Sequence, residues 1–565
     1  MVPRLLKILN RDVASMNQAA LVLAVFSFLS QVFGLLRDRL LATLVGPSSV
    51  LDVYYAAFRI PDFIYNSVAV LFSVTVLIPF ITNYLHDTSE AKGEHLRRFS
   101  NSVFTVYVVG MMAICLIAFV LMPVLTRISA PGFSVAQHAQ LVLFSRLMLF
   151  SPFLMGLSSL LGSFAQVQKK FFSFAIAPVF YNVGILIGIL AFRPIWGMSG
   201  VVLGVVLGAL MYLLIQLPTL ASLHKLPQLT RAVDWVTMKK VWLLSLPRTL
   251  ASSLTNVTFL IITAIASLLV AGSLSIFQFS YNIQTTPLMI IGISYAVAAF
   301  PTLTRLFAEG DRKAFVDMIH RATRNIFFLS VPASLLIIVL RAQIVRVLLG
   351  SGEFSWNDTR LVAASVALFC ISVTAQCMVL LLVRGFYAIG NTKTPLKINI
   401  IAVTGTIVAA GLLLLSFRNY PMFRDFIESL LRIDGAVGSS VVLLSLAFSI
   451  GQIGNAIGLW IYLHRHLRGH TAETNRMLRA LLHMVCAGIL AAAGAYGTLE
   501  LIGKGIDQTA FIGVLLQGVV AGIVGVSIYA VTLVLLKNED IGLFLQTLRS
   551  RFWKQKPLTP EQAEL

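Results

Sequence analysis

Charged residues are scarce in this sequence. Asp, Glu, Lys and Arg make up only 12% of its 565 residues, about half the share that soluble proteins carry. Hydrophobic residues account for 58% of the chain, and the mean hydropathy is +0.88. Apolar runs of about 20 residues, the length that crosses the hydrocarbon core of a bilayer, recur along the whole chain. The sequence therefore excludes an ordinary soluble enzyme and predicts a polytopic helical membrane protein.

Cysteine and catalytic motifs are also rare. The four cysteines lie within apolar runs and lack the spacing of metal ligands, which predicts small buried side chains. They are Cys115, Cys370, Cys377 and Cys486. The sequence contains no GxSxG, Walker or HExxH motif, and most of its nine histidines fall in predicted basic loops. We therefore expect no enzyme activity, no metal site and no cofactor.

Acidic residues are fewer than basic ones, 23 against 43, which gives a net charge of +20. Such an excess could indicate a nucleic-acid partner, but Lys and Arg concentrate in alternate loops and near both ends of the chain. This is the positive-inside pattern of membrane proteins, and attraction to anionic lipid accounts for it. We expect no nucleic-acid partner, membrane lipids as neighbours, and both termini in the cytoplasm.

The hydropathy pattern predicts an all-α protein with about fourteen transmembrane helices. The expected spans are 20–36, 51–83, 102–125, 140–165, 171–192, 199–220, 241–270, 274–303, 325–345, 361–383, 396–416, 438–463, 480–502 and 510–536. The basic, amphipathic start of the chain, residues 1–19, reads as a cytoplasmic lead-in rather than a signal peptide. Residues 541–565 read as a basic cytoplasmic tail.

An internal repeat divides the chain. The segment "LVGPSSVLDVYYAAFRIP" from Leu44 matches "LVAGSLSIFQFSYNIQTTP" from Leu269, 225 positions later. A second match, from "GSFAQVQKKFF" to "GFYAIGNTKTP", has nearly the same offset. Six spans lie within one period, so the halves should share one topology and form two pseudo-symmetric lobes around a cavity. The expected domains are an N-lobe at 20–222, a C-lobe at 223–464 and two extra helices within 465–540.

A polar stripe runs along the second predicted span. Its members are spaced by three or four residues and so lie on one helical face: Asp52, Tyr55, Arg59, Asp62 and Asn66. Pro61 removes a backbone donor there, and we expect a kink. Two interpretations stay open. Arg59 could pair with either aspartate and serve helix packing alone, or the stripe could line a cavity, where ionisable residues at membrane depth usually lie.

Three charges, Arg37, Asp38 and Arg39, follow the first predicted span. They could reach the lipid headgroups at a helix end, or they could turn into the same cavity as the stripe. Arg146 and Arg248 are further candidates for that cavity. A cluster of arginines suits an anionic group, because the guanidinium fork binds phosphate in bidentate fashion.

Several segments together resemble the MurJ family of lipid II flippases, within the MOP superfamily that also includes MATE exporters. They are spread over about the first 400 residues: "SQVFGLLRDRLLATLVG", "LDVYYAAFRIPDF", "ISAPGF", "FAIAPVFYNVGI", "AVAAFPTLTR" and "RGFYAIGNTKTPLKI". The resemblance implies two lobes around a cationic cavity. It also implies transport of undecaprenyl-diphosphate disaccharide-pentapeptide from the inner to the outer leaflet of the bacterial cytoplasmic membrane, by alternating access, for peptidoglycan synthesis.

The resemblance also assigns residues. The family's Arg-Asp pair matches Arg37 and Asp38, its second-helix aspartate matches Asp52, and a basic position before an Ile-Pro or Leu-Pro step matches Arg59. We add Arg39 and Arg248 as substrate-binding residues, and Asp62, Asn66, Arg146 and Asn282 as further candidates. The expected partner is the lipid-linked substrate. We expect the transporter to be a monomer that contacts enzymes of cell-wall synthesis.

The chain departs from the family pattern where arginines are usual. Those positions hold Gln31, Tyr65, Asn66 and Asn282 here, which marks a divergent member. Our hypothesis is that Arg248, where the family usually has a small residue, restores one cation. Two alternatives remain at this point: a flippase for another polyprenyl-diphosphate-linked glycan, and a non-transporting scaffold for wall synthesis. A MATE-like exporter of cations is disfavoured, because the candidate site is basic.

Overall fold

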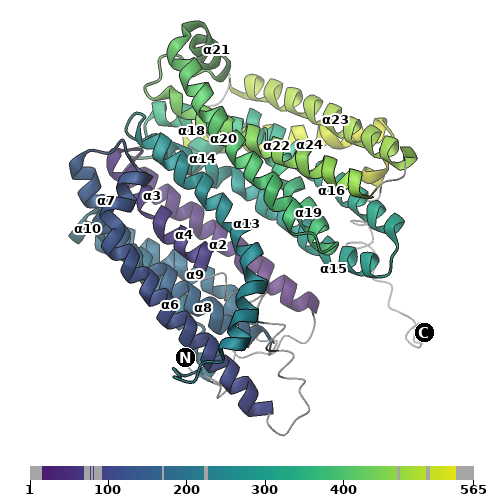
Figure 1. Ribbon diagram of the computed structural model, residues 1–565. Coiled ribbons are helices and arrows are strands. Elements are labelled where there is room, and N and C mark those ends of the chain that lie inside the picture. Colours follow the sequence, from purple (N-terminus) through teal and green to yellow (C-terminus); the bar gives the residue numbers. More distant parts are fainter. Residues whose placement is uncertain are drawn as a thin grey trace. The chain divides into compact units, whose positions relative to one another are not determined.

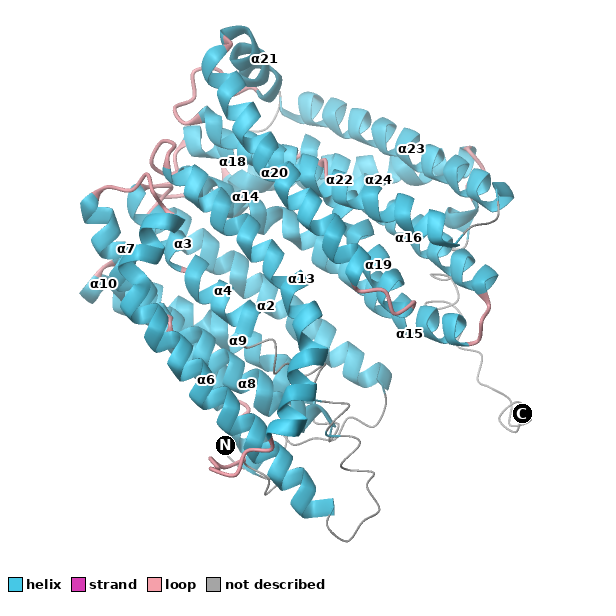
Figure 2. Cartoon of the chain, in the orientation of Figure 1, coloured by secondary structure: helices cyan, strands magenta, loops and turns pink. Residues whose placement is uncertain are grey.

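The computed structural model describes residues 16–68, 77, 81, 92–167, 171–221, 227–467, 471–503 and 510–542. All regular elements within these ranges are helices (Figures 1 and 2). The all-α fold class is therefore confirmed. Most of the predicted lead-in at 1–19 and of the predicted tail at 541–565 lies outside the described residues.

The described helices follow one another along the chain. Their bounds are α2 (Met16–Leu44), α3 (Ser49–Ala57), α4 (Arg59–Val68), α6 (Lys92–Ser129), α7 (Val135–Met148), α8 (Phe150–Val167), α9 (Phe171–Ile187), η2 (Gly188–Phe192), α10 (Arg193–Trp196), α11 (Met198–Leu214), α12 (Leu217–Ala221), α13 (Trp235–Ser267), α14 (Ser273–Pro287), η3 (Leu288–Ile293), α15 (Ser294–Ala308), α16 (Arg312–Val339), α17 (Arg341–Leu349), α18 (Trp356–Cys370), α19 (Val373–Ala388), α20 (Lys393–Asn419), α21 (Pro421–Leu431), η4 (Ser439–Val441), α22 (Val442–Leu467), α23 (Thr471–Gly503) and α24 (Phe511–Leu535). The elements η2 and η3 are π-helical, and η4 is a 3₁₀ turn.

Ten helices in the described ranges are long and apolar enough to cross a membrane, or eleven if the bent pair α18–α19 is one span. Each of these coincides with a predicted span. The remaining three predicted spans fall on α2, on α3 with α4, and on α13. A multi-pass membrane protein is thus confirmed, and the full count of fourteen stays a prediction.

Two boundaries differ from the sequence prediction. The first helix, expected at 20–36, continues to Leu44, so Arg37, Asp38 and Arg39 lie within α2 and not beyond its end. The second span breaks at Phe58, which is the C-cap of α3. Pro61 lies in the first turn of α4 and has no backbone N–H to donate to a carbonyl of α3. Phe58 keeps helical angles, with φ −72° and ψ −25°, so the helix is interrupted one turn before the proline, in agreement with the break in hydrogen bonding that the sequence predicts there.

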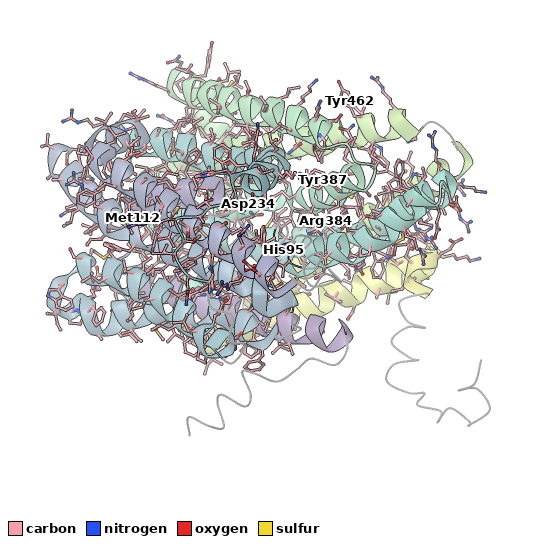
Figure 3. The ribbon with its side chains drawn as sticks, turned by 60° about the horizontal axis from the view of Figure 1, so that its bottom comes forward. His95, Met112, Asp234, Arg384, Tyr387 and Tyr462 are labelled. Atoms are coloured by element: carbon pink, nitrogen blue, oxygen red, sulfur yellow. The ribbon has the colours of Figure 1, made fainter. Side chains whose placement is uncertain are left out.

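The described helices pack into two compact units. The first comprises Met1–Ile283, Leu348–Ser365 and Thr392–Ala447, and the second comprises Gln284–Val347, Val366–Asn391 and Phe448–Leu565. These ranges cut across the boundaries expected for the two lobes, which therefore stay a prediction. In the second unit, α16 packs against α19 and α23, and α23 packs along α24. Arg384, on α19 (Figure 3), donates to the carbonyl of Ile293.

Small residues bring α9 and α11 together in the first unit. Glycines recur every four residues on both helices, at Gly184 and Gly188 and at Gly200, Gly204 and Gly208. A Cβ built on Gly204 would lie 2.5 Å from the Cα of Gly188, and one built on Gly184 would lie 2.3 Å from the Cα of Gly208. Only glycine permits such a backbone approach, which is the small-residue packing typical of membrane helices.

The chain before α13 is fastened to α6. Three backbone N–H groups donate to side chains of α6: Gln228 to Asn101 at 2.8 Å, Thr230 to Thr105 at 2.9 Å and Asp234 to Ser102 at 3.1 Å. Figure 3 marks Asp234 at the start of α13 and His95 on α6. These bonds fix where α13 begins, and α13 in turn packs against α4.

Asp234→Ala is expected to destabilise the start of α13 by about 1 kcal/mol, the usual effect of losing an N-cap. The Asp234 carboxylate accepts from the Thr237 N–H at 3.1 Å and from the Thr237 hydroxyl at 2.6 Å. These bonds hold the pKa of Asp234 below its usual value, so its stabilisation is complete above the ordinary Asp pKa and is lost as pH falls through the lowered one. Thermal unfolding in detergent at neutral and at acidic pH checks this. Asp234→Asn, which keeps the cap without the charge, should retain most of the stability at neutral pH and lose the pH dependence.

Candidate functional site

Asp38 is the centre of a polar cluster in the first unit. It lies on α2, and only 3% of its surface is exposed. The Nε and Nη2 atoms of Arg37 donate to Asp38 Oδ1 at 3.0 and 2.8 Å. The other oxygen, Oδ2, accepts from the Asn282 amide of α14 at 2.8 Å. The Arg37–Asp38 pair therefore has no net charge. The Asp38 carboxylate fixes the Arg37 guanidinium and also binds α14 through Asn282.

The cluster continues to Arg59. Gln278, one turn before Asn282 on α14, donates its side-chain amide N–H to Asn282 Oδ1 at 2.8 Å. Arg59 Nη2 donates to Gln278 Oε1 at 2.8 Å, and its Nε donates to Thr263 of α13 at 2.8 Å. The guanidinium also lies over the Phe259 ring, 5.3 Å from its centroid. An unbroken run of hydrogen bonds thus connects the two arginines, and we call it the Arg37–Arg59 relay.

At its other end the relay reaches α9. Arg37 Nη1 lies 3.5 Å from Asn182 Oδ1, and the Asn182 amide donates to the Ser30 hydroxyl at 3.1 Å. Five helices therefore contribute side chains to one network: α2, α4, α9, α13 and α14. With Asp38 offsetting one arginine, the relay carries a net charge of +1. Its chemistry suits recognition of an anion by guanidinium donors.

Asp52 has a different place. Its Oδ2 accepts from the Gly272 N–H at 2.7 Å, and its Oδ1 accepts from the N–H and hydroxyl of Ser275 at 2.8 and 2.6 Å. These donors lie at the start of α14. The first N–H groups of any helix have no hydrogen-bond acceptor within the helix itself. A carboxylate is favourable at such a helix N-terminus. In this conformation Asp52 caps α14, and both its oxygens are engaged.

The rest of the stripe lies along α3 and α4. Arg59 forms no direct ion pair with Asp52 or Asp62, and its guanidinium donates to Thr263 and Gln278 instead. The charges of Arg59 and Asp62 still interact at longer range. Among the described residues the Asp62 carboxylate has no hydrogen-bond or ion-pair partner. Asn66 donates to the Asp62 carbonyl at 2.9 Å and to Asn256 at 3.4 Å. The buried Tyr55 hydroxyl has no hydrogen-bond partner within the described ranges.

Three other residues were predicted to contact the substrate. Arg39 is half-buried on α2. Arg146 donates to the Phe119 carbonyl of α6 at 3.0 Å and lies 4.5 Å from the centroid of the Phe119 ring. Arg248 belongs to α13, and its side chain falls outside the described residues. The assignments of these residues to the substrate stay predictions.

Sequence reasoning missed Thr263, Gln278 and Asn182 as members of the relay. The signal for Gln278 was present, because Gln278 and Asn282 are polar and four residues apart in an otherwise apolar helix. Within the described ranges, no group of three or more His, Cys, Asp or Glu side chains is placed to hold a metal ion.

Comparison with known proteins decides the family. The family model described as "Lipid II flippase MurJ" matches residues 41–516. The chain belongs to the MurJ family. One MurJ relative, "Probable lipid II flippase MurJ" of Rhizobium tropici, is 26% identical over 544 residues, which covers 92% of this chain and 94% of the relative. Another, "Lipid II flippase MurJ" of Burkholderia cenocepacia, is 25% identical over 487 residues, which covers 84% and 88%.

Solved structures show the same fold. A structure of MurJ in an inward closed conformation matches with a TM-score of 0.69 at 18% identity, over 91% of this chain and all of that one. An inward-facing MATE multidrug transporter of the MOP superfamily matches with a TM-score of 0.61 at 12% identity, over 79% of this chain and 98% of that one. The MurJ and MATE folds are thus shared. The family is one of transporters and is not a class of catalytic enzymes, and membership places this chain among multi-pass proteins of the bacterial inner membrane.

Proposed function

We propose that this protein is a lipid II flippase, which moves the lipid-linked peptidoglycan precursor from the inner to the outer leaflet of the bacterial inner membrane. Membership of the MurJ family is the observation that carries the proposal. The Arg37–Arg59 relay supports it, since two guanidinium groups within one network suit a diphosphate. The proposed cycle is alternating access by a monomer with both termini in the cytoplasm, in contact with enzymes of wall synthesis.

Arg37 and Arg59 have separate roles in this proposal. Arg59 donates hydrogen bonds to the neutral groups Thr263 and Gln278, and the opposite charge that acts on it is that of Asp62, with which it forms no direct ion pair. Its guanidinium is therefore proposed to bind a phosphate in place of this longer-range attraction. Asp38 forms an ion pair with Arg37, which orients the Arg37 guanidinium and neutralises its charge while no anion is bound. Arg39 and Arg248 are proposed as further phosphate contacts, and Asp62, Asn66 and Arg146 as contacts to the rest of the headgroup. Asn282, in a position where relatives usually have arginine, acts by holding Asp38.

The test is complementation of a cell depleted of its own lipid II flippase. The chain is expected to restore growth, whereas Arg37→Ala, Arg59→Ala and Arg248→Ala should each abolish it, because each removes a phosphate contact. Arg98→Gln is the control, since the Arg98 side chain is 65% exposed and far along the sequence from the relay. Equal protein levels in membranes must be shown for every variant.

The outcomes separate the alternatives. Failure of the unmodified chain to complement, with transport of another polyprenyl-diphosphate-linked glycan in vesicles, would replace the proposed substrate. Growth with a charge-reversed Arg37→Glu variant would favour a scaffold that does not transport. Full activity of Arg248→Ala alone would remove Arg248 from the site and leave the other assignments in place.

A further inference from the structure

The second unit contains a polar pocket that the proposed transport does not use. Its volume is about 280 Å³, and it is lined by the N-terminal halves of α16 and α23. A water molecule takes about 30 Å³ of liquid volume, so the pocket has room for a group of many atoms. Its lining residues are Asp317, His320, Arg321, Arg324, Arg476 and Met477.

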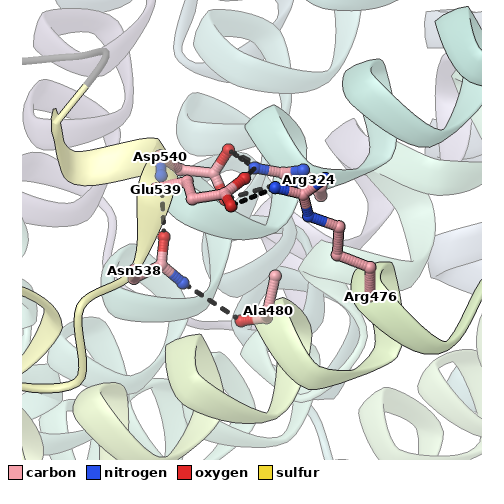
Figure 4. A network of polar contacts seen from close by, with 6 residues as sticks. All are labelled: Arg324, Arg476, Ala480, Asn538, Glu539 and Asp540. Carbon is pink, nitrogen blue, oxygen red and sulfur yellow. Dashed lines mark hydrogen bonds and ion pairs between the residues drawn. The ribbon is translucent and has the colours of Figure 1, made fainter. Parts of the chain in front are cut away.

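Two of the three lining arginines are neutralised by the chain that follows α24. Arg324 binds Asp540 through its Nε, at 3.1 Å from both carboxylate oxygens, and through its Nη2, at 2.6 Å from Oδ1. Arg476 pairs with Glu539. Figure 4 shows both pairs, with Asn538 donating to the Ala480 carbonyl of α23. These contacts fix one wall of the pocket and leave little free charge there.

Three groups on α16 lack partners among the described residues. Arg321 is exposed and forms no hydrogen bond or ion pair in that part of the chain. The Asp317 Oδ1 atom is buried and accepts no hydrogen bond, and His320, only 7% exposed, has an unpartnered Nδ1 atom. Leaving a buried polar atom unsatisfied costs about 1–3 kcal/mol. The pocket thus presents one cation and two acceptor positions at the same helical face.

The place of the pocket along α16 and α23 also limits which ligands can reach it. Both α16 and α23 are candidate membrane spans, from Arg312 and from Arg476 respectively. The pocket residues of α16, from Asp317 to Arg324, and those of α23 precede the predicted apolar spans at 325–345 and 480–502. That position corresponds to the depth of the lipid headgroups. The positive-inside pattern predicts that this end faces the cytoplasm. Basic pockets between membrane helices on that side are suited to lipid headgroups.

We propose that this pocket binds the headgroup of a bilayer phospholipid that carries both a phosphate and a primary ammonium group. The phosphate lies against Arg321, and the ammonium N–H groups donate to Asp317 Oδ1 and to His320 Nδ1. Three arginines and three carboxylates, Asp317, Glu539 and Asp540, balance around the pocket, so a zwitterion enters without unpaired charge. A choline headgroup has the same net charge but no N–H donor, and it leaves the Asp317 oxygen unsatisfied.

Lipid binding to the full chain in detergent, followed by native mass spectrometry, tests the proposal. The probes are phosphatidylethanolamine, phosphatidylcholine and phosphatidylglycerol of equal chain length. We expect tighter binding of phosphatidylethanolamine than of the other two, and a loss of about tenfold with Arg321→Gln, since that variant removes a charge-assisted hydrogen bond to the phosphate. Asp317→Asn should reduce the preference over phosphatidylcholine. Arg312→Gln, at the start of the same helix and outside the pocket, should change neither.

The opposite results are equally clear. Equal binding of the three lipids, or an Arg321→Gln variant that binds phosphatidylethanolamine normally, overturns the proposal. Inorganic phosphate or free phosphoethanolamine that competes as well as the lipid would show a site for a soluble ion instead. Preferred binding of an undecaprenyl-diphosphate lipid would assign the pocket to the transport substrate and would also overturn the proposal. Melting temperatures in detergent confirm that each variant is folded. The proposal is independent of the transported glycan.

Discussion

Asp38→Ala is expected to destabilise the protein by about 3 kcal/mol, the lower end for removing one partner of a buried ion pair. It is also expected to abolish complementation. The Asp38 side chain is almost fully buried, and it accepts from both Arg37 and Asn282. Without it the Arg37 guanidinium keeps only its 3.5 Å contact with Asn182 in the cluster. Thermal unfolding in detergent and growth of flippase-depleted cells measure the two effects.

A double variant separates stability from transport. Arg37→Met combined with Asp38→Leu removes both charges and should recover much of the lost stability, because the penalty comes from the unpaired charge. It should not recover growth, since the phosphate contact is gone. Asp38→Asn keeps an acceptor for Asn282 and should lie between the single variant and the unmodified chain. If Asp38→Ala melts like the unmodified protein, the carboxylate is not what holds this cluster.

Gly204→Val is expected to have the second large effect, a loss of about 4 kcal/mol or more, which is exceptional for one substitution. The added Cβ would lie 2.5 Å from the Gly188 Cα and 3.1 Å from the Gly184 carbonyl oxygen. Both are backbone atoms, so relief requires the separation of α9 and α11. The measurement is the fraction of protein that remains monodisperse after extraction into detergent.

The matched control is Gly405→Val on α20, where a Cβ would meet no atom within 4 Å. That variant carries the same change in helix propensity without the contact. It should remain monodisperse, and Gly204→Ala should be intermediate. Normal extraction and melting of Gly204→Val would show that the two helices can separate without loss of the fold.

The helices were largely predictable from sequence, and the relay was not. Apolar runs set the position of each span, because the membrane requires a length and a composition. The polar stripe also placed Arg59, Asp62 and Asn66 on one face of α4. By contrast, Asp38 and Asn282 are 244 residues apart, and Arg59 and Thr263 are 204 apart. Such contacts depend on how helices pack, which a hydropathy pattern does not contain.

Asp52 shows the same limit at a single residue. Its place on an apolar helix marked it as important, and the structure confirms that it is buried. The sequence could not show that its partners are backbone N–H groups of a helix start, since those groups exist in every helix. For Asn282 the sequence showed an unusual residue but not its contact. Its departure from the family's arginine was visible in sequence, but its bond to Asp38 came only from the fold.

The internal repeat gives the relay a further meaning. With an offset of 225 residues, Pro47 is the counterpart of Gly272 and Asp38 is the counterpart of Thr263. A Cβ on Gly272 would lie 2.9 Å from the Pro47 carbonyl oxygen, so a residue meets its own counterpart there. The bond from Asn282 to Asp38 and the bond from Arg59 to Thr263 join corresponding helices of the two repeats, although the counterpart of Asn282 is Ala57, two residues before Arg59. If the two repeats are related by a twofold axis, the helix starts that meet at Pro47 and Gly272 lie close to it, and a ligand bound nearby would contact corresponding helices from both repeats.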